Sequence, residues 1–156
     1  MGEYRGSGIT SDLQLLNKLR EFKNFDGVFP VDELPVHLSE NHAIIINFEK
    51  HDQKGSHWVC AINSPEFGKI YIDPLGLPPP IEIDQFLKRG SGKKDYLINT
   101  IEYQPMSSDD CGSYCYHFVK SFLVGWNPRD FLPGNLKDKP TPKNNLIVRK
   151  EFWEND

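Results

Sequence analysis

Cys111 is the residue of this sequence best placed to act as a nucleophile. In the run Asp109-Asp110-Cys111-Gly112 it stands where a turn meets the predicted start of a helix. Asp109 or Asp110 is a natural N-cap, and Gly112 leaves room for a substrate backbone beside the sulfur. A helix N-terminus and a neighbouring imidazolium lower the pKa of a cysteine thiol from about 8.5 to roughly 3.5–7.5, and the thiolate is the attacking form. The position predicts thiolate chemistry.

The other two cysteines, Cys60 and Cys115, are interpreted as small core residues, because unpaired cysteine is among the most buried residue types. An odd count of three cysteines, with no export signal, indicates reduced thiols. A zinc site formed by Cys111, Cys115 and His117 is the alternative, but these residues lack the paired spacing of structural zinc motifs.

His57 is the predicted general base. Two alternating apolar runs, residues 58–62 and 69–73, are joined by a turn-rich connection of hairpin length. Centring this hairpin at residue 65 pairs Trp58 with Ile72, Cys60 with Ile70, and His57 with Asp73. Opposite side chains on one face have Cβ atoms about 4.5–5.5 Å apart. The register therefore predicts that Asp73 fixes the tautomer of His57, in the order nucleophile, base and orienting acid.

The remaining histidines are weaker candidates for the base. His117 lies six residues after Cys111, hence about 9 Å further along a helix and turned by about 120°, so we expect that it cannot reach the sulfur. His37, His42 and His51 lie in polar or loop-like stretches with no obvious orienting carboxylate. We expect these three to be exposed loop residues.

Gln104 is a candidate for stabilising negative charge on the substrate oxygen. An amide just upstream of the nucleophile's helix can point its NH₂ group at the developing oxyanion, alongside the backbone N–H of Cys111. The alternative is a surface glutamine at the end of a strand.

The elements that must position these residues follow from hydrophobic periodicity and from turn residues. A capping box at Ser11 and Gln14 begins a helix that should end near residues 24–27. The helix that follows Cys111 should begin at Gly112 and end at Gly125. Its wide apolar stripe predicts that it is the central helix of the core. Between them we expect a loop, a buried strand over residues 43–48, the hairpin, a short helix over residues 81–88 and a strand over residues 95–103.

Composition bounds the class of protein. With 156 residues, 38% hydrophobic residues and a net charge of −4, the chain predicts one domain with its own core and not a dedicated nucleic-acid binder. Residues 129–150 carry six basic and two acidic residues, and we expect the proline-rich segment 128–156 to be a solvated wrapping tail. The longest aliphatic run, residues 43–46, is far shorter than the ~20 residues that span a bilayer, and no signal peptide opens the chain. We expect no membrane association.

The order His57-Trp58, Asp73-Pro-Leu-Gly76, Gln104 and Asp110-Cys111-Gly112 resembles the adenovirus endopeptidase (adenain) family of cysteine proteases. That family is related to the proteases of ubiquitin-like modifiers. The interval of seven residues from Gln104 to Cys111 is similar to the adenain spacing, which is one residue longer than is usual in the modifier proteases. The resemblance covers residues 40–126.

The resemblance implies Cys111 as nucleophile, His57 as general base and acid, Asp73 as orienting acid and Gln104 as oxyanion donor. Trp58 would pack beside the site and contact substrate. The implied fold is α+β and papain-like, a single protease domain over residues 1–156 with a flexible terminus over residues 1–9. The implied substrates are viral capsid or core precursor proteins, cleaved during virion maturation at small, glycine-containing sites in the infected cell or the virion.

The chain also departs from the adenovirus enzymes. It is shorter, and its orienting acid is Asp73 where adenoviral members often have glutamate, which suggests a compact relative from another DNA virus, a virophage or a related mobile element. We find no counterpart of the cysteine that binds an activating peptide, and only the 129–150 tail could contact DNA. We therefore expect that no cofactor is required, although the resemblance leaves a peptide or DNA activator possible. We also expect a monomer, with weak nucleic-acid contact possible through the 129–150 tail.

Three further expectations remain open. The same machinery could serve an isopeptidase that removes ubiquitin-like tags. The chain could also be an inactive binding domain that kept the fold, or a nucleic-acid accessory that acts through its tail. The N-terminal sequence Tyr4-Arg-Gly-Ser-Gly8 resembles a cleavage pattern of the family and suggests self-trimming after Ser7, or else a flexible end.

Overall fold

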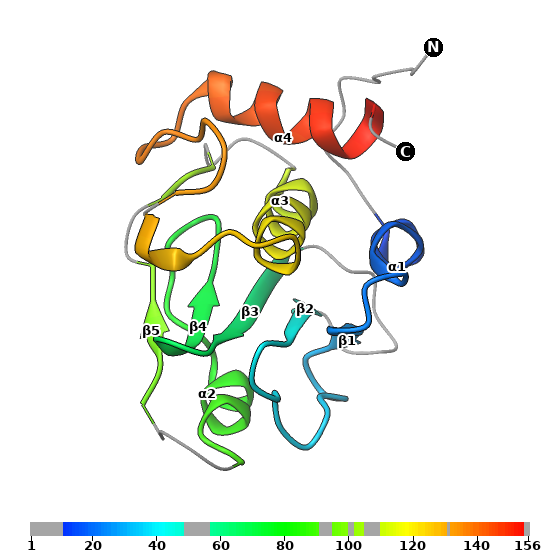
Figure 1. The fold of residues 1–156 in the computed structure, drawn as a ribbon, viewed down its shortest axis with the longest axis vertical. Coiled ribbons are helices and arrows are strands. Elements are labelled where there is room, and N and C mark those ends of the chain that lie inside the picture. The colour runs from blue at the N-terminus through cyan, green and yellow to red at the C-terminus, as the bar shows by residue number, and fades with distance from the viewer. Residues whose placement is uncertain are drawn as a thin grey trace.

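The computed structural model describes residues 11–48, 57–90, 95–99, 102–104, 110–130 and 132–154. Within these ranges four α-helices, one short 3₁₀ helix and five strands follow one another (Figure 1). In chain order they are α1 (Asp12–Leu19), β1 (Phe25–Pro30), β2 (Ala43–Asn47), β3 (Trp58–Ser64), β4 (Gly68–Ile72), α2 (Ile81–Leu87), β5 (Leu97–Ile98), α3 (Cys111–Leu123), η1 (Pro128–Asp130) and α4 (Pro142–Glu154).

The five strands form one mixed sheet in the order β1-β2-β3-β4-β5. The two central pairings, β2 with β3 and β3 with β4, are antiparallel, and the two outer pairings are parallel. In Figure 1, α1, α3 and α4 lie on one side of the sheet and α2 on the other. This arrangement confirms the expected α+β class, with the helix of Cys111 against a mixed sheet.

Each face of the sheet has its own core. Side chains alternate along β3, so that Trp58, Cys60 and Ile62 join the core under α1, α3 and α4. Val59 and Ala61 join the core under α2. Because both faces are covered, β3 shows an almost unbroken apolar sequence, as expected of a strand buried on both sides.

The register of the β3–β4 hairpin differs from the prediction by two residues. Cys60 lies opposite Ile72 and not opposite Ile70, and the pairing of His57 with Asp73 across the ladder was wrong. Because the shift is even, every side chain keeps the face it was assigned. His57 directly precedes β3 and meets Asp73 along a diagonal.

The hairpin turn explains the shift. Ser64 pairs with Gly68, so that the loop comprises residues 65–67. The Ser64 hydroxyl accepts hydrogen bonds from the N–H groups of Glu66 (3.3 Å) and Phe67 (3.2 Å), and Gly68 has φ of 78°. Positive φ suits glycine and allows the chain to turn one residue later than the composition suggested.

The N-terminal and edge elements also differ from expectation. The first helix ends at Leu19, and residues 25–30, which were expected to be loop, form β1. The Asp26-Gly27 pair resembles a turn in sequence, and Pro30 argues against a central strand, but an edge strand that pairs only with β2 tolerates both. Of the strand expected over residues 95–103, the described residues 95–99 and 102–103 contain only Leu97–Ile98 as strand.

The proline-rich tail contains a helix that the sequence analysis did not predict. Pro142 occupies the start of α4, where a missing N–H costs no helical hydrogen bond. Val148 and Phe152 are both 0% exposed and belong to the core shared with α3. The segment is thus packed against the helix of Cys111 and is not only a solvated strap. None of the helices in the described ranges is long and apolar enough to cross a bilayer.

Candidate active site

A tight turn after β4 positions Asp73. The Gly76 N–H donates to the Asp73 carbonyl (2.8 Å), and the Leu75 N–H donates to the Asp73 carboxylate at Oδ1 (2.8 Å). Asp at the first position, Pro74 at the second and glycine at the fourth is the composition that a type I turn favours. An Asp side chain that bonds its own backbone two residues on strengthens such a turn. The local sequence therefore orients this carboxylate.

Asn99, just after β5, fixes the backbone of Asp73. Its Oδ1 accepts the Asp73 N–H (2.8 Å), and its Nδ2 donates to the Asp73 carbonyl (2.7 Å). Asp73 is fully buried, so its position depends on these contacts. Sequence analysis did not single out Asn99, because no local motif connects it with a turn 26 residues earlier in the chain.

His57 and Asp73 lie together as predicted, although not through the predicted register. Nε2 of His57 is 3.0 Å from Oδ1 of Asp73, and Phe48 packs against the imidazole in a T-shaped arrangement with ring centroids 4.9 Å apart. Because Asp73 occupies Nε2, Nδ1 is the ring nitrogen left for the Cys111 side chain, with which His57 also hydrogen-bonds.

Burial lowers the pKa of His57, but the hydrogen bonds to Asp73 and Cys111 and the negative charge of both groups outweigh it. The net result raises the pKa of His57 from 6.5 to about 9. An imidazolium at neutral pH is the partner that a cysteine thiolate requires.

Cys111 is the first residue of α3 and is 5% exposed. The backbone N–H of Trp58 donates to its Sγ (3.3 Å). The first N–H groups of a helix have no partner within the helix and place partial positive charge at this end. Hydrogen-bond donors and positive charge thus surround the sulfur from α3, from Trp58 and from His57.

Asp110 precedes the helix as expected, but its side chain does not cap it. Oδ1 of Asp110 instead accepts a hydrogen bond from Nε of Arg149 on α4 (2.6 Å). The expectation of a side-chain N-cap was therefore wrong for this residue, because a buried carboxylate finds a stronger partner in a guanidinium than in a helix N–H.

Gln104 is 2% exposed and is held through the main chain. The N–H groups of Tyr103 (2.8 Å) and Gln104 (3.1 Å) both donate to the Pro74 carbonyl. Pro74 directly follows Asp73, so the segment that carries Gln104 is joined to the turn that carries the orienting acid. The alternative of a surface glutamine was wrong, and the oxyanion role stays a prediction.

Trp58 lies beside the site, with its side chain 6% exposed in the same core as Cys111. Its backbone N–H donates the hydrogen bond to the sulfur. The expected contact of Trp58 with substrate stays a prediction.

Cys60 and Cys115 are both 0% exposed core residues, which confirms their interpretation. Burial, together with contact with Cys60, raises the pKa of the Cys115 thiol. Thiols in such surroundings are inert compared with one at a helix N-terminus.

Two histidines have carboxylate partners that sequence analysis missed. Nδ1 of His42 is 2.6 Å from Oδ1 of Asp26, so the expectation that His42 lacks an orienting acid was wrong. Nδ1 of His117 is 2.8 Å from Oε1 of Glu151, and its Nε2 is 3.0 Å from the Pro133 carbonyl. In the part of the chain that the structure describes, no group of three or more His, Cys, Asp or Glu side chains is arranged to hold a metal ion.

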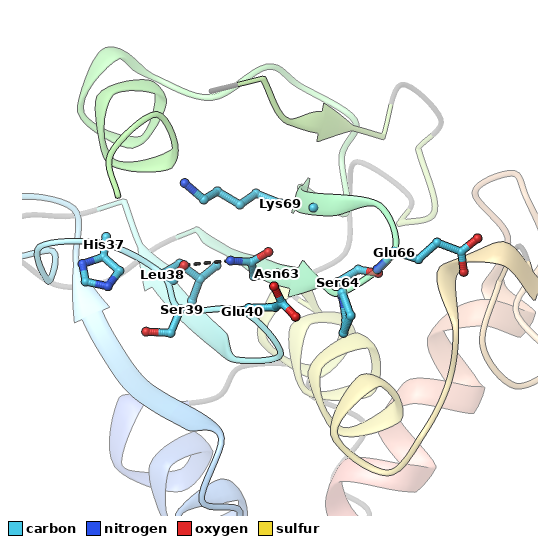
Figure 2. A pocket seen from close by; sticks show the side chains of 10 residues that line it. His37, Leu38, Ser39, Glu40, Asn63, Ser64, Glu66 and Lys69 are labelled. Carbon is cyan, nitrogen blue, oxygen red and sulfur yellow. Dashed lines mark hydrogen bonds between the residues drawn. The ribbon is translucent and has the colours of Figure 1, made fainter. Parts of the chain in front are cut away.

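A pocket of about 330 Å³ lies at the turn end of the β3–β4 hairpin, where Nδ2 of Asn63 donates to the Leu38 carbonyl (2.8 Å; Figure 2). It lies at the opposite end of the hairpin from Asp73 and is separate from the site described above. Its lining comprises His37, Leu38, Ser39, Glu40, Asn63, Ser64, Pro65, Glu66, Gly68 and Lys69. His37 is exposed, as expected. His51, Asp109 and the N-terminal segment Tyr4–Gly8 lie outside the described residues.

The chain is similar to one known protein in sequence and to another in fold. Over 102 residues, 60% of this chain, it is 34% identical to a protein of Acanthamoeba polyphaga mimivirus described as "Putative thiol protease R355", and the match covers 33% of that protein. The chain therefore spans about a third of the length of this curated relative. No family model matches the chain.

Solved structures show the same architecture. The Se-Met crystal structure of the ASFV pS273R protease superposes with a TM-score of 0.63 and 14% identity, covering 99% of this chain and 71% of that one. A second crystal structure of this protease gives a TM-score of 0.62, with 97% and 70% covered. The chain has the fold of the ASFV pS273R protease. This finding confirms the α+β, papain-like fold, whereas the specific resemblance to adenain stays a prediction.

Proposed function

We propose that the chain is a viral cysteine protease with Cys111 as its nucleophile. The observation that carries the proposal is one cluster, in which Cys111 Sγ at the start of α3 contacts His57, and His57 bonds the buried Asp73 at 3.0 Å. The 34% identity to a mimivirus protein described as a thiol protease supports the same class.

The proposed reaction is an acyl-transfer cycle. The Cys111 thiolate attacks the scissile carbonyl carbon, and the carbonyl oxygen takes the negative charge. The side-chain amide of Gln104 and the N–H of Cys111 stabilise this oxyanion. The His57 imidazolium gives its proton to the leaving amine as the C–N bond breaks. Neutral His57 then removes a proton from water, whose oxygen attacks the thioester and releases the acid and the thiolate.

The proposed substrates are precursor proteins of a virus, cleaved at small, glycine-containing sites during particle maturation in the infected cell or in the virion. The viral origin of both similar proteins supports this class of substrate. We propose that a monomer carries out the reaction without a bound cofactor, because nucleophile, base, orienting acid and oxyanion donor all come from this chain.

A paired assay tests the proposal. The purified chain is offered a capsid-precursor peptide with a Gly-X-Gly site and a ubiquitin-like fusion protein, each with and without added DNA, and Cys111→Ser is the control. We expect the wild type to cleave the precursor peptide at a rate that DNA does not change. Preference for the fusion would replace the endopeptidase assignment by an isopeptidase, and cleavage of neither substrate would favour a binding domain.

A further inference from the structure

Helix α4 contacts the two segments that directly precede the proposed nucleophile and the proposed oxyanion donor. Arg149 of α4 donates from Nε to Oδ1 of Asp110 (2.6 Å), the residue before Cys111. Asn144 of α4 donates from Nδ2 to the carbonyl of Tyr103 (3.1 Å), the residue before Gln104. Helix α4, which lies outside the catalytic cluster, therefore bonds the residue before Cys111 through its side chain and the residue before Gln104 through its main chain.

The Asn144 contact is buried, and other hydrogen bonds reinforce it. Asn144 is 0% exposed, and its Oδ1 accepts the Lys137 N–H (2.8 Å), so its side chain has one orientation. The Tyr114 hydroxyl on α3 lies 3.1 Å from the same Tyr103 carbonyl and 2.8 Å from Oδ1 of Asn145. The start of α3, the Gln104 segment and α4 thus form one connected set of hydrogen bonds.

The charge at Asp110 makes its contact with Arg149 more than a packing detail. Asp110 is 0% exposed, and its carboxylate belongs to the residue adjacent to Cys111. A like charge near an ionisable group disfavours its ionisation. A buried carboxylate without its cation would therefore oppose the Cys111 thiolate, whereas the guanidinium of Arg149 compensates it.

We propose that Arg149 is a positioning residue, which holds and neutralises Asp110 so that the start of α3 can present a thiolate at Cys111. The inference rests on the proposed function, since it concerns the same sulfur. It assigns to α4 a role in setting the pH range of the reaction as well as in the fold.

Other ionisable groups surround Cys111 and Asp110 and must be kept constant in any test. His57 before β3 and Cys115 on α3 interact with Cys111, Asp73 after β4 interacts with His57, and Tyr114 on α3 interacts with Asp110 and Arg149. None of them is changed by a substitution at Arg149, Asp110 or the exposed Lys150 of α4. A shift in pH dependence that follows the charge at Asp110 and Arg149 is therefore specific to this pair.

The experiment measures the rate at which iodoacetamide alkylates Cys111 between pH 4 and pH 10, by mass spectrometry of the Cys111 peptide. For Arg149→Met we expect the pH midpoint to rise by roughly one unit, because an uncompensated carboxylate opposes the thiolate. For Asp110→Asn, which keeps the side-chain shape and leaves Arg149 in place, we expect the midpoint to fall. The double variant Asp110→Asn/Arg149→Met should lie near the wild type.

Lys150→Met is the matched control, because it removes one positive charge from the neighbouring position of α4 and should leave the midpoint unchanged. Variants that lower the Tm but keep the wild-type midpoint would show a structural role only and would overturn the inference. If Arg149→Met does not fold, an unchanged midpoint in Asp110→Asn still overturns it. A wild-type Cys111 that reacts no faster than a free thiol would overturn both this inference and the proposed function.

Discussion

Two histidines, the half-buried His57 near the start of α3 and the buried His117 within α3, differ in what their second ring nitrogen contacts. His57 and His117 each lie close to a carboxylate, at 3.0 Å from Asp73 and 2.8 Å from Glu151 respectively. The second nitrogen of His57 is left for Cys111, whereas that of His117 lies 3.0 Å from the Pro133 carbonyl. A histidine with an acid partner is therefore a base for catalysis only where its other nitrogen faces the reacting group.

The same comparison separates a functional from a structural pair. His117 joins α3 to the loop at Pro133 and, through Glu151, to α4, so its contacts hold three parts of the fold together. His57 connects the ends of two strands to the start of a helix, where a substrate must bind if the sulfur is the nucleophile. The first histidine should matter for stability and the second for turnover.

The largest expected effect distinguishes the sulfur at the start of α3 from the one a turn later. Cys111→Ala should reduce turnover at least about 10⁴-fold, since no other group can form the thioester, and should leave the Tm within a few degrees. Cys115→Ala should keep turnover within about threefold and cost about 1–2 kcal/mol of stability, because Cys115 is a buried core residue. Peptide hydrolysis and thermal melting of the two variants check these expectations. Appreciable turnover in Cys111→Ala would exclude Cys111 as the nucleophile.

The next effect tests the two histidines directly. His57→Gln should lower kcat about 10²–10⁴-fold, because general acid and base catalysis is lost. His117→Gln should lower the Tm and leave kcat within a few-fold of the wild type. Equal loss of kcat in both variants, measured well below their Tm, would contradict the distinction drawn between the two pairs.

A smaller effect is expected at Gln104. Gln104→Glu has nearly the same shape but replaces an N–H donor by an acceptor, and loss of one oxyanion donor costs about 10²–10³ in kcat. The rate at which iodoacetamide alkylates Cys111 should not fall by more than about threefold, because that reaction forms no oxyanion. Parallel loss of both rates would assign Gln104 a structural role.

The smallest effect concerns pH. Hydrogen bonding and charge from Asp73 help to raise the pKa of His57 to about 9, so Asp73→Asn should move the alkaline limb of kcat/KM to lower pH and reduce the rate at pH 7 about tenfold. The imidazolium of His57 also stabilises the folded wild type below its ordinary pKa of 6.5, and this contribution is lost as pH rises through about 9.

Asp26→Asn is the control for the Asp73 variant, because Asp26 pairs with His42 away from Cys111. The control should keep the wild-type pH profile. An alkaline limb that is the same in Asp73→Asn and the wild type would show that Asp73 does not set the protonation of His57.

Sequence analysis could propose three of the four catalytic residues from local signatures. His57 is beside a predicted hairpin strand, Asp73 opens a Pro- and Gly-containing turn, and Cys111 stands at the start of a helix. Gln104 has no such signature, and it was proposed from its place upstream of Cys111 and from the family resemblance. The face of each hairpin residue was also predictable, since alternation fixes the face even when the register is displaced by two residues. The register itself was not, because it depends on the turn around Gly68, whose geometry tertiary packing selects.

Contacts between distant segments could not be predicted. Asn99, Asn144 and Arg149 each reach a residue 26 to 41 positions away, and no spacing in the sequence encodes such a pairing. Helix α4 was also missed, because four prolines, at positions 128, 133, 140 and 142, lie before it or at its first residue and gave the appearance of an irregular tail. Its apolar residues gain stability only by packing on α3.

The most direct test of the central claim is the reactivity of the three thiols of one protein. Wild type and His57→Gln are treated with iodoacetamide at pH 6, and alkylation of Cys60, Cys111 and Cys115 is followed by peptide mass spectrometry. The account predicts that Cys111 alone reacts in the wild type, faster than a free thiol, and that His57→Gln slows it at least tenfold. Equal rates at Cys111 in the two proteins would contradict the account.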